Sequence, residues 1–510
     1  MEKNERISVD VITTTDMHSQ FLNGNYGSNI YRAGQYVKDI RKRNKHVLLL
    51  DSGGSLAGSL PAYYYAIVAP YKRHPMIKLM NAMQYDASGI SSDEFKFGLS
   101  FLTRSVSLAR FPWLSANIEY NMTREPYFST PYVIKQYQDV RIGIIGLTAD
   151  GLMKNEYAEM EPDVKIEKTL LSAKRWIRYI HETEKIDFLI VIYHGGLDKI
   201  SQTTNSRHSE NANEAEKLIR EMGVIDLIIT AHQHQTVIGK DNETVYVQAG
   251  QNAEELVHIN IQFKKRTNSY EIEHVNAEAI NLNQHNEDEA LLKLTYYDRK
   301  AVTHWSNEII AETSCSLQVN SLEDMVAGSH HFTQLLHDSL RYAFNNNITC
   351  VNVPRNGEQG LKQQIQNKDI YEAYPHPDKP IDITLLGQQI KDILEYSYAH
   401  LEIEDDHLKQ TVIDETLCTQ WQGFNYEVNM KKPPFQRVTI KGIDLNGSYR
   451  VTMTDYCFRN YQFIIGDVIV NRDSFEYPMS FIMTKLLNTH DYRPQIKNNF
   501  IVNSVTLLDI

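Results

Sequence analysis

Residues 7–21 read ISVDVITTTDMHSQF, an apolar and β-branched run that breaks into Asp16 and His18. Such a run predicts a buried β-strand, with the polar residues in the loop at its carboxyl end. Four later segments repeat the pattern, at 45–54, 141–150, 187–196 and 226–235, and helical patterns such as 33–44 and 213–223 separate them. The alternation predicts the α/β class, with several parallel strands whose carboxyl ends converge on one place.

The bulk composition is that of a folded globular protein. A length of 510 residues favours two or more domains, and the hydrophobic share of 42% allows large cores. The net charge of −12 is spread without long acidic runs, which argues against a nucleic-acid polymer or an anionic membrane as the main partner. Because the start lacks a signal-peptide pattern and no run approaches about 18 apolar residues, we expect a cytoplasmic protein.

The cysteines point to ordinary core positions. Cys315, Cys350, Cys418 and Cys457 are far apart and form no CxxC pair. This spacing predicts reduced thiols and argues against a disulfide framework or a zinc knuckle.

Residues of metal-ligand type gather at the predicted strand ends. Asp16 and His18 are two residues apart, His232 and His234 repeat this spacing, and His194 stands at a third strand end. A single histidine in such a place is more often structural, but one carboxylate with four imidazoles suits a borderline divalent ion. We therefore predict a divalent metal cofactor, Mn²⁺ or Zn²⁺.

The spacing of these blocks resembles the 5′-nucleotidase and 2′,3′-cyclic-nucleotide 2′-phosphodiesterase family of two-metal phosphoesterases. TTTDMHSQF resembles the family's first block, and the later blocks are VLLLDSGGSLAG, MNAMQYDASGISSDEFKFG, FPWLSANI, VIYHGG and LIITAHQHQ. The resemblance implies a four-layer α/β metallophosphoesterase domain (an α+β sandwich) over 1–283. A helical linker at 284–324 and a smaller α/β substrate-binding domain at 325–510 would follow it.

Two of the blocks depart from the family pattern. The family reads D-x-G-D in the second block, and its last Asp bridges the two metals, whereas this chain has Gly54 there. The family reads G-N-H-E-F-D in the third block, and here Ser92, Asp93 and Lys96 stand at the Asn, His and Asp positions. The resemblance therefore implies a changed two-metal site.

The catalytic positions allow two interpretations. As a general acid, Asp93 would need a raised pKa, and Lys96 beside it would have the opposite effect. Alternatively, Asp93 replaces a metal ligand and Lys96 binds phosphate.

The second domain is expected to supply substrate contacts. The family's N-x-G-G-x-R motif holds phosphate, and the resemblance places Asn352 at its Asn, with Arg355 close to the position of its Arg. The family stacks a base between two aromatic rings, and Phe424 or Tyr426 with Tyr456 would form that pair. These rings are equally well explained as core aromatics.

Two functional hypotheses follow. The first is a metal-dependent phosphohydrolase acting on a nucleotide or another small phosphate ester, with residual or altered activity. The second is a non-catalytic family member that binds one metal, a nucleotide or a protein partner. The presence or loss of a two-ion site distinguishes them.

Overall fold

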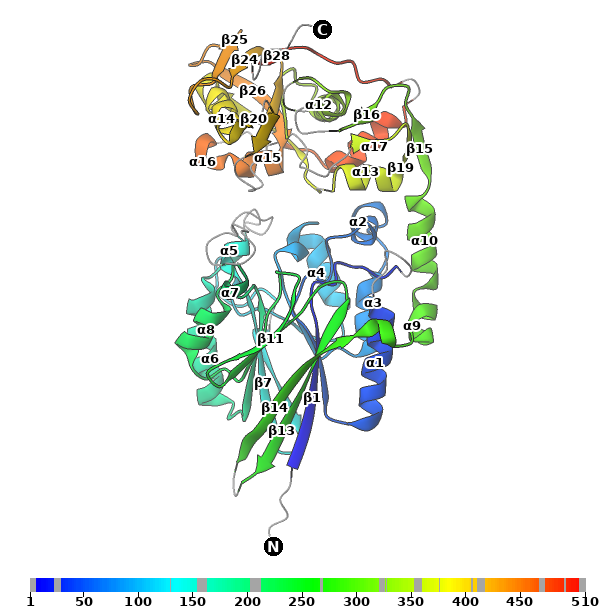
Figure 1. The fold of residues 1–510 in the computed structure, drawn as a ribbon, viewed down its shortest axis with the longest axis vertical. Coiled ribbons are helices and arrows are strands. Elements are labelled where there is room, and N and C mark those ends of the chain that lie inside the picture. Colours follow the sequence, from blue (N-terminus) through cyan, green and yellow to red (C-terminus); the bar gives the residue numbers. More distant parts are fainter. Residues whose placement is uncertain are drawn as a thin grey trace. The chain divides into compact units, whose positions relative to one another are not determined.

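The computed structural model divides the chain into two compact units, Met1–Val302 and Thr303–Ile510 (Figure 1). Within them it describes residues 6–22, 29–128, 130–153, 163–201, 212–266, 269–320, 326, 328–352, 360–375, 377–404, 407–410, 418–466, 473–489 and 492–503. Arg355 lies outside the described residues.

The first unit is built on two six-stranded sheets. The first has the order β14 (Tyr270–Asn281), β13 (Glu255–Lys265), β1 (Arg6–Thr14), β2 (Val47–Asp51), β3 (Ala87–Gly89) and β4 (Trp113–Leu114). The second has the order β11 (Thr236–Asp241), β12 (Thr244–Ala249), β10 (Leu227–Ile229), β9 (Phe188–His194), β7 (Val140–Thr148) and β6 (Tyr132–Tyr137). A smaller sheet pairs β5 (Ile118–Tyr120) with β8 (Val164–Ile166). The five predicted strands are thus confirmed as β1, β2, β7, β9 and β10.

Helices cover the outer faces of both sheets. Figure 1 shows α1 (Ile30–Arg43) and α3 (Pro75–Met83) on one side, and α6 (Thr169–Thr183) and α8 (Ala215–Met222) on the other. The remaining helical elements are α2 (Leu60–Tyr63), η1 (Tyr64–Val68), η2 (Asp93–Phe95), α4 (Leu99–Leu108), α5 (Asp150–Met153), α7 (Asp198–Ser201), η4 (Leu282–Gln284), α9 (Glu289–Leu294) and α10 (Tyr296–Ser306). The predicted four-layer sandwich is confirmed.

The alternation of side chains along the strands explains the layers. Val9 and Val11 of β1 pack in one buried cluster with Ile142 and Ile144 of β7, so this core lies between the sheets. Ile145, the residue after Ile144 in β7, points to the other face and packs in a second buried cluster with Ile177 of α6. Strands buried on both faces are therefore mostly apolar, as the sequence shows.

The parallel strands bring their carboxyl ends to the same edge. β1, β2, β3 and β4 run parallel, as do β7, β9, β10 and β12. Of the residues predicted to bind metal, Asp16 and His18 follow β1, His232 and His234 follow β10, and His194 is the last residue of β9.

The second unit has its own core around a five-stranded sheet, in the order β23 (Thr419–Gln422), β17 (Thr349–Asn352), β26 (Ser448–Thr454), β20 (Pro380–Leu386) and β27 (Asp473–Ser474). A three-stranded sheet joins β25 (Val438–Lys441), β24 (Asn425–Asn429) and β28 (Phe500–Asn503). The helices are α12 (His331–Phe344), α13 (Asn367–Ala373), α14 (Gly387–Ala399), α15 (Asp455–Asn460), α16 (Gln462–Ile465) and α17 (Met479–Leu487). α14 begins at Gly387, because Thr384–Leu386 pair with β26.

The predicted linker 284–324 is divided between the units. α9 lies in the first unit, and α10 spans the boundary after Val302. β15 (Ile309–Glu312) lies in the second unit and pairs with β19 (Gln364–Gln366). β16 (Leu317–Gln318) pairs with β18 (Gly360–Leu361), and β21 (Leu401–Glu404) pairs with β22 (His407–Gln410). Among the residues that the structure describes, no helix combines the length and the apolar character that crossing a membrane requires.

Candidate metal centre

Three imidazoles face one carboxylate oxygen at the strand ends. Asp16 Oδ1 lies 4.0 Å from Nε2 of His18, 3.9 Å from Nε2 of His194 and 3.8 Å from Nε2 of His234. One ligand atom each from Asp16, His18 and His234 can be chosen within 4.8 Å of one another. These three donors fit a single divalent ion, since nitrogen and oxygen ligands about 2 Å from a shared ion lie 3–4 Å apart.

The ligand-type residues hold an unusual backbone conformation. The φ angles of Asp16, His18, His232 and His234 are 48°, 47°, 74° and 54°. Residues other than glycine rarely adopt this left-handed backbone region. Backbone strain of this kind concentrates at functional sites. The D-x-H and H-x-H spacings therefore belong to two tight loops that meet around the Asp16 carboxylate.

Neighbouring groups fix the orientation of the rings. His194 donates from Nδ1 to the carbonyl oxygen of Ser52 at 2.8 Å, and His18 Nδ1 lies 3.1 Å from Asn252 Oδ1. Donation from Nδ1 leaves Nε2 with its lone pair available for a metal. Burial also lowers the pKa of His234, which favours the neutral ring that a metal needs. Sequence reasoning missed Asn252, because an amide in a loop gives no motif.

His232 contacts the same carboxylate through its backbone. Its amide donates to Asp16 Oδ2 at 3.0 Å, and its ring centroid lies 6.2 Å from that of His194. The structure thus brings all five predicted ligand residues together, with His232 and His194 beside the three-donor set.

Asp93 and Lys96 form an ion pair at the end of β3. Their Oδ1 and Nζ atoms are 2.6 Å apart, and the two side chains are 22% and 33% exposed. Burial alone would raise the pKa of Asp93, but the Lys96 ammonium, with the His18 and His194 rings, holds it well below its usual range. Asp93 is therefore ionised at neutral pH and has no proton to donate.

Glu94 organises the loop after β2, a role that the sequence did not reveal. Its carboxylate accepts from the amides of Gly54 at 3.3 Å, Ser55 at 2.6 Å and Leu56 at 3.3 Å. It also accepts from the Ser91 amide at 2.7 Å. On the other side of this loop, burial raises the pKa of Asp51 to about 7. A carboxylate surrounded by backbone amides fixes loop geometry strongly.

In the second unit, the described residues predicted to bind substrate lie in different environments. Phe424 and Tyr426 belong to the hydrophobic core, where Tyr426 stacks on Phe500 at 5.0 Å between centroids. Asn352 ends β17, and the Arg459 guanidinium lies 5.8 Å over the half-buried Tyr456 ring. The core placement is the alternative that the sequence left open for Phe424 and Tyr426.

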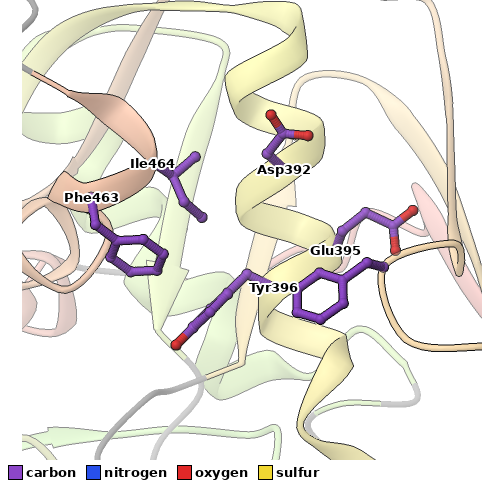
Figure 2. A pocket seen from close by; sticks show the side chains of 6 residues that line it. Asp392, Glu395, Tyr396, Phe463 and Ile464 are labelled. Carbon is purple, nitrogen blue, oxygen red and sulfur yellow. The ribbon is translucent and has the colours of Figure 1, made fainter.

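An aromatic pocket opens elsewhere in the second unit (Figure 2). It has a volume of about 500 Å³ and is lined by Asp392, Glu395, Tyr396, Phe435, Phe463 and Ile464. The Tyr396 ring centroid lies 4.9 Å from that of Phe463 and 6.3 Å from that of Phe435. The Phe435 and Phe463 side chains remain 59% and 64% exposed.

Known proteins are similar to both parts of the chain. Residues 308–463 match the family model of the 5′-nucleotidase C-terminal domain. The chain is 31% identical over 242 residues to Protein UshA of Yersinia enterocolitica. This alignment covers 46% of the chain and 42% of that protein. It is 27% identical over 253 residues to the 2′,3′-cyclic-nucleotide 2′-phosphodiesterase/3′-nucleotidase of Salmonella typhimurium, over 46% of the chain and 38% of that protein.

The chain thus contains a 5′-nucleotidase C-terminal domain, and similar curated proteins are named UshA and 2′,3′-cyclic-nucleotide 2′-phosphodiesterase/3′-nucleotidase. The alignments span less than half the length of these curated relatives. Solved structures show the same two-domain fold. A putative 5′-nucleotidase from Staphylococcus aureus matches with a TM-score of 0.78 at 19% identity, over 97% of this chain and 100% of that one. A 5′-nucleotidase precursor from Thermus thermophilus matches with a TM-score of 0.61 at 17% identity, over 97% and 99%.

Proposed function

We propose that the chain is a single-metal phosphoesterase of the 5′-nucleotidase family that hydrolyses nucleotides or related phosphate esters slowly. The observation that carries the proposal is the approach of three imidazole Nε2 atoms to Asp16 Oδ1, within 4.0 Å, beside a glycine at position 54. Similar proteins are named as nucleotide phosphoesterases. These names support nucleotides as the class of substrate.

Asp16, His18 and His234 would hold the ion, and His194 and His232 would flank it. When bound, a divalent ion supplies positive charge that polarises a phosphoryl oxygen and stabilises the charge developing in the transition state. The donor set of one carboxylate and imidazoles favours Zn²⁺ or Mn²⁺. A second ion would need a further bridging carboxylate, and position 54 supplies none.

Lys96 would replace part of the positive charge that a second metal ion would supply. Its ammonium pairs with Asp93 at 2.6 Å and is partly exposed, so it can bind a phosphate oxygen while remaining paired. Asp93 then acts as a proton acceptor or as a neighbour of the ion. Because its pKa is lowered, it is a weak base and no acid, and this explains why turnover should be slow.

The test is hydrolysis of bis-p-nitrophenyl phosphate by the purified chain with Mn²⁺, Zn²⁺ or Co²⁺. We expect slow metal-dependent turnover that His194→Ala and His232→Ala reduce and that His234→Ala abolishes. Lys96→Met should raise KM more than it lowers kcat, because the ammonium binds phosphate in the ground state as well. Active protein would then be tested on 2′,3′-cyclic nucleotides and 5′-nucleotides.

A second candidate function is binding without catalysis. The Asp93–Lys96 ion pair favours it, because the pair removes the proton donor that a leaving group requires. Metal binding with no turnover above the His234→Ala background would support this function and contradict the phosphoesterase proposal.

The pocket of Figure 2 is our candidate for a base-binding surface in the second unit. Its exposed Phe435 and Phe463 rings offer stacking faces, and the Asp392 carboxylate can accept from an amino group. Phe463→Ala should weaken adenosine binding by roughly tenfold, since stacking on one ring contributes about 1–3 kcal/mol. Unchanged affinity by calorimetry would exclude this surface.

A further inference from the structure

Two of the four cysteines meet in the hydrophobic core of the second unit. Cys350 lies in β17 and Cys457 in α15, 107 residues further along the chain, and their Sγ atoms are 3.6 Å apart. Both residues are fully buried and belong to the same cluster of core side chains. The wide spacing of the cysteines in the sequence does not reveal this contact.

Neighbouring backbone fixes both cysteines in place. Thr349, which precedes Cys350, pairs with Thr452 of the parallel strand β26. α15 begins directly after β26, and its N-cap residue Thr454 accepts the Cys457 amide on Oγ1 at 3.1 Å. Hydrogen-bonded elements therefore hold the two sulfur atoms near each other. A disulfide has an S–S separation of about 2.0 Å, so the sulfurs would have to approach by about 1.5 Å more.

The other two cysteines contact oxygen atoms. Cys418 Sγ donates to the carbonyl oxygen of Ser397 at 3.4 Å, and Cys315 Sγ lies 3.2 Å from the hydroxyl of Thr313. All four cysteines are among the described residues, and within that part of the chain only the pair at 350 and 457 brings two sulfur atoms into contact. The buried Cys418 and the half-buried Cys315 are thus internal controls.

We propose that Cys350 and Cys457 are a reversible oxidation site, at which hydrogen peroxide or another small peroxide joins β17 to α15 by a disulfide. The thiolate of one cysteine attacks a peroxide oxygen, the O–O bond breaks, and the released hydroxide takes up the thiol proton as water. The thiol of the other cysteine then attacks the sulfenic acid, the S–S bond forms, and a second water leaves. The two electrons that the thiols lose reduce the peroxide. This inference goes beyond the proposed function, because it involves no metal ligand.

Burial determines which oxidants reach the pair and how fast they react. Hydrogen peroxide is little larger than water and can enter through brief local openings, whereas a bulky disulfide such as oxidised glutathione needs an exposed thiol. Burial, with the hydrogen bond to Cys457, raises the pKa of the Cys350 thiol. Tyr426 and Tyr461 also interact with this thiol, and burial raises their pKa values, so both rings stay neutral. Because the thiolate is the reactive form, oxidation should be slow at neutral pH and faster as pH rises.

The disulfide would stabilise the second unit and tie together two segments that carry predicted substrate residues. It would link positions 107 residues apart and so restrict the unfolded chain. Asn352 lies two residues after Cys350, and Tyr456 directly precedes Cys457. Oxidation should therefore raise the Tm of the second unit and leave that of the first unit unchanged.

The experiment treats the full chain with hydrogen peroxide, as Cys315→Ala to remove the half-buried thiol, then blocks free thiols and digests with trypsin without reduction. The three remaining cysteines fall in separate tryptic peptides, 342–355, 410–431 and 451–459. Mass spectrometry should show 342–355 linked to 451–459, two hydrogens lighter than their sum, and dithiothreitol should release both. Adding Cys418→Ala should leave the linked peptide in place, and adding Cys350→Ala should abolish it. Oxidised glutathione at equal concentration should give much less of it.

Three results would overturn the proposal. The first is a folded chain that gives no linked peptide, or that links 410–431 as readily. The second is an equal yield from the chain in urea, because proximity in the fold would then play no part. The third is an unchanged or lowered Tm of the second unit after oxidation, measured by scanning calorimetry, because the bond would then distort the fold. The wild-type chain gives the same peptide readout if Cys315→Ala does not fold.

Discussion

His74 is a buried ring that contributes to the response of this fold to pH. It accepts the Met76 amide at 3.2 Å at the start of α3, and its ring centroid lies 5.6 Å from that of Tyr65. Burial, aided by the charges of Arg104 and Lys78, lowers its pKa to about 3. The folded protein therefore keeps a neutral ring where the unfolded chain is protonated.

The sign of the pH effect follows from proton binding. Between about pH 3 and pH 6.5 the unfolded state binds the extra proton, so the free energy of unfolding falls as pH falls through this window. At pH 4.5 we expect His74 to account for a loss of about 2–3 kcal/mol relative to pH 7. Urea unfolding of metal-free wild type and His74→Asn, which keeps a capping acceptor, measures this difference. An equal pH dependence in both proteins would contradict the assignment.

The limits of sequence reasoning are clearest at single residues. Asp16, His18, His194, His232 and His234 could be predicted to meet, because parallel strands bring their ends to one edge. The conformation of Gly54 could not be predicted, because it depends on a left-handed turn and on backbone hydrogen bonds between two distant segments. The burial of Phe424 and Tyr426 likewise depends on Phe500, more than 70 residues away in the chain.

At the scale of elements, the loop after β2 and the short helix η2 act together. Glu94 of η2 accepts three consecutive amides of that loop and the Ser91 amide. The loop carbonyls in turn accept the amides of Asp16 and His18. Glu94 is therefore a positioning residue for the metal ligands, although it is not placed among them.

Replacing Glu94 should damage both stability and metal affinity. Glu94→Gln sets an amide NH₂ against backbone donors, so we expect a loss of about 2–4 kcal/mol in unfolding free energy and about 10–100-fold weaker Zn²⁺ binding. Chemical denaturation and calorimetric titration measure the two effects. The control is Glu243→Gln, whose side chain is 97% exposed. A variant that loses stability but binds Zn²⁺ normally would show that Glu94 only supports the fold.

Secondary structure could largely be read from the sequence where one pattern dominates. The strands β1, β2, β7, β9 and β10 are mostly apolar and rich in β-branched residues, so they were predictable, as were α1 and α8. The boundary between β20 and α14 was not, because Thr384–Leu386 suit either element until pairing with β26 is known. Pairing between distant strands decides such ambiguous positions.

At the scale of the whole molecule, the two compact units have separate hydrophobic cores. The proposed metal ligands, Asp16, His18 and His234, lie in the first unit. A ligand that binds only the folded state of a domain raises the free energy of unfolding of that domain. The increase is about 2.7 kcal/mol at a ligand concentration 100 times the Kd. We therefore expect two calorimetric transitions, of which Zn²⁺ raises one and leaves the other unchanged. A single transition, or an equal shift of both, would contradict this independence.

The central claim is a site for one ion held by Asp16, His18 and His234, and metal content tests it most directly. The full chain would be loaded with Zn²⁺, freed of excess ion and analysed by mass spectrometry of the metal, beside His234→Ala. We predict one Zn²⁺ per wild-type chain and none in the variant. Two ions per wild-type chain, or one ion retained in His234→Ala, would contradict the account.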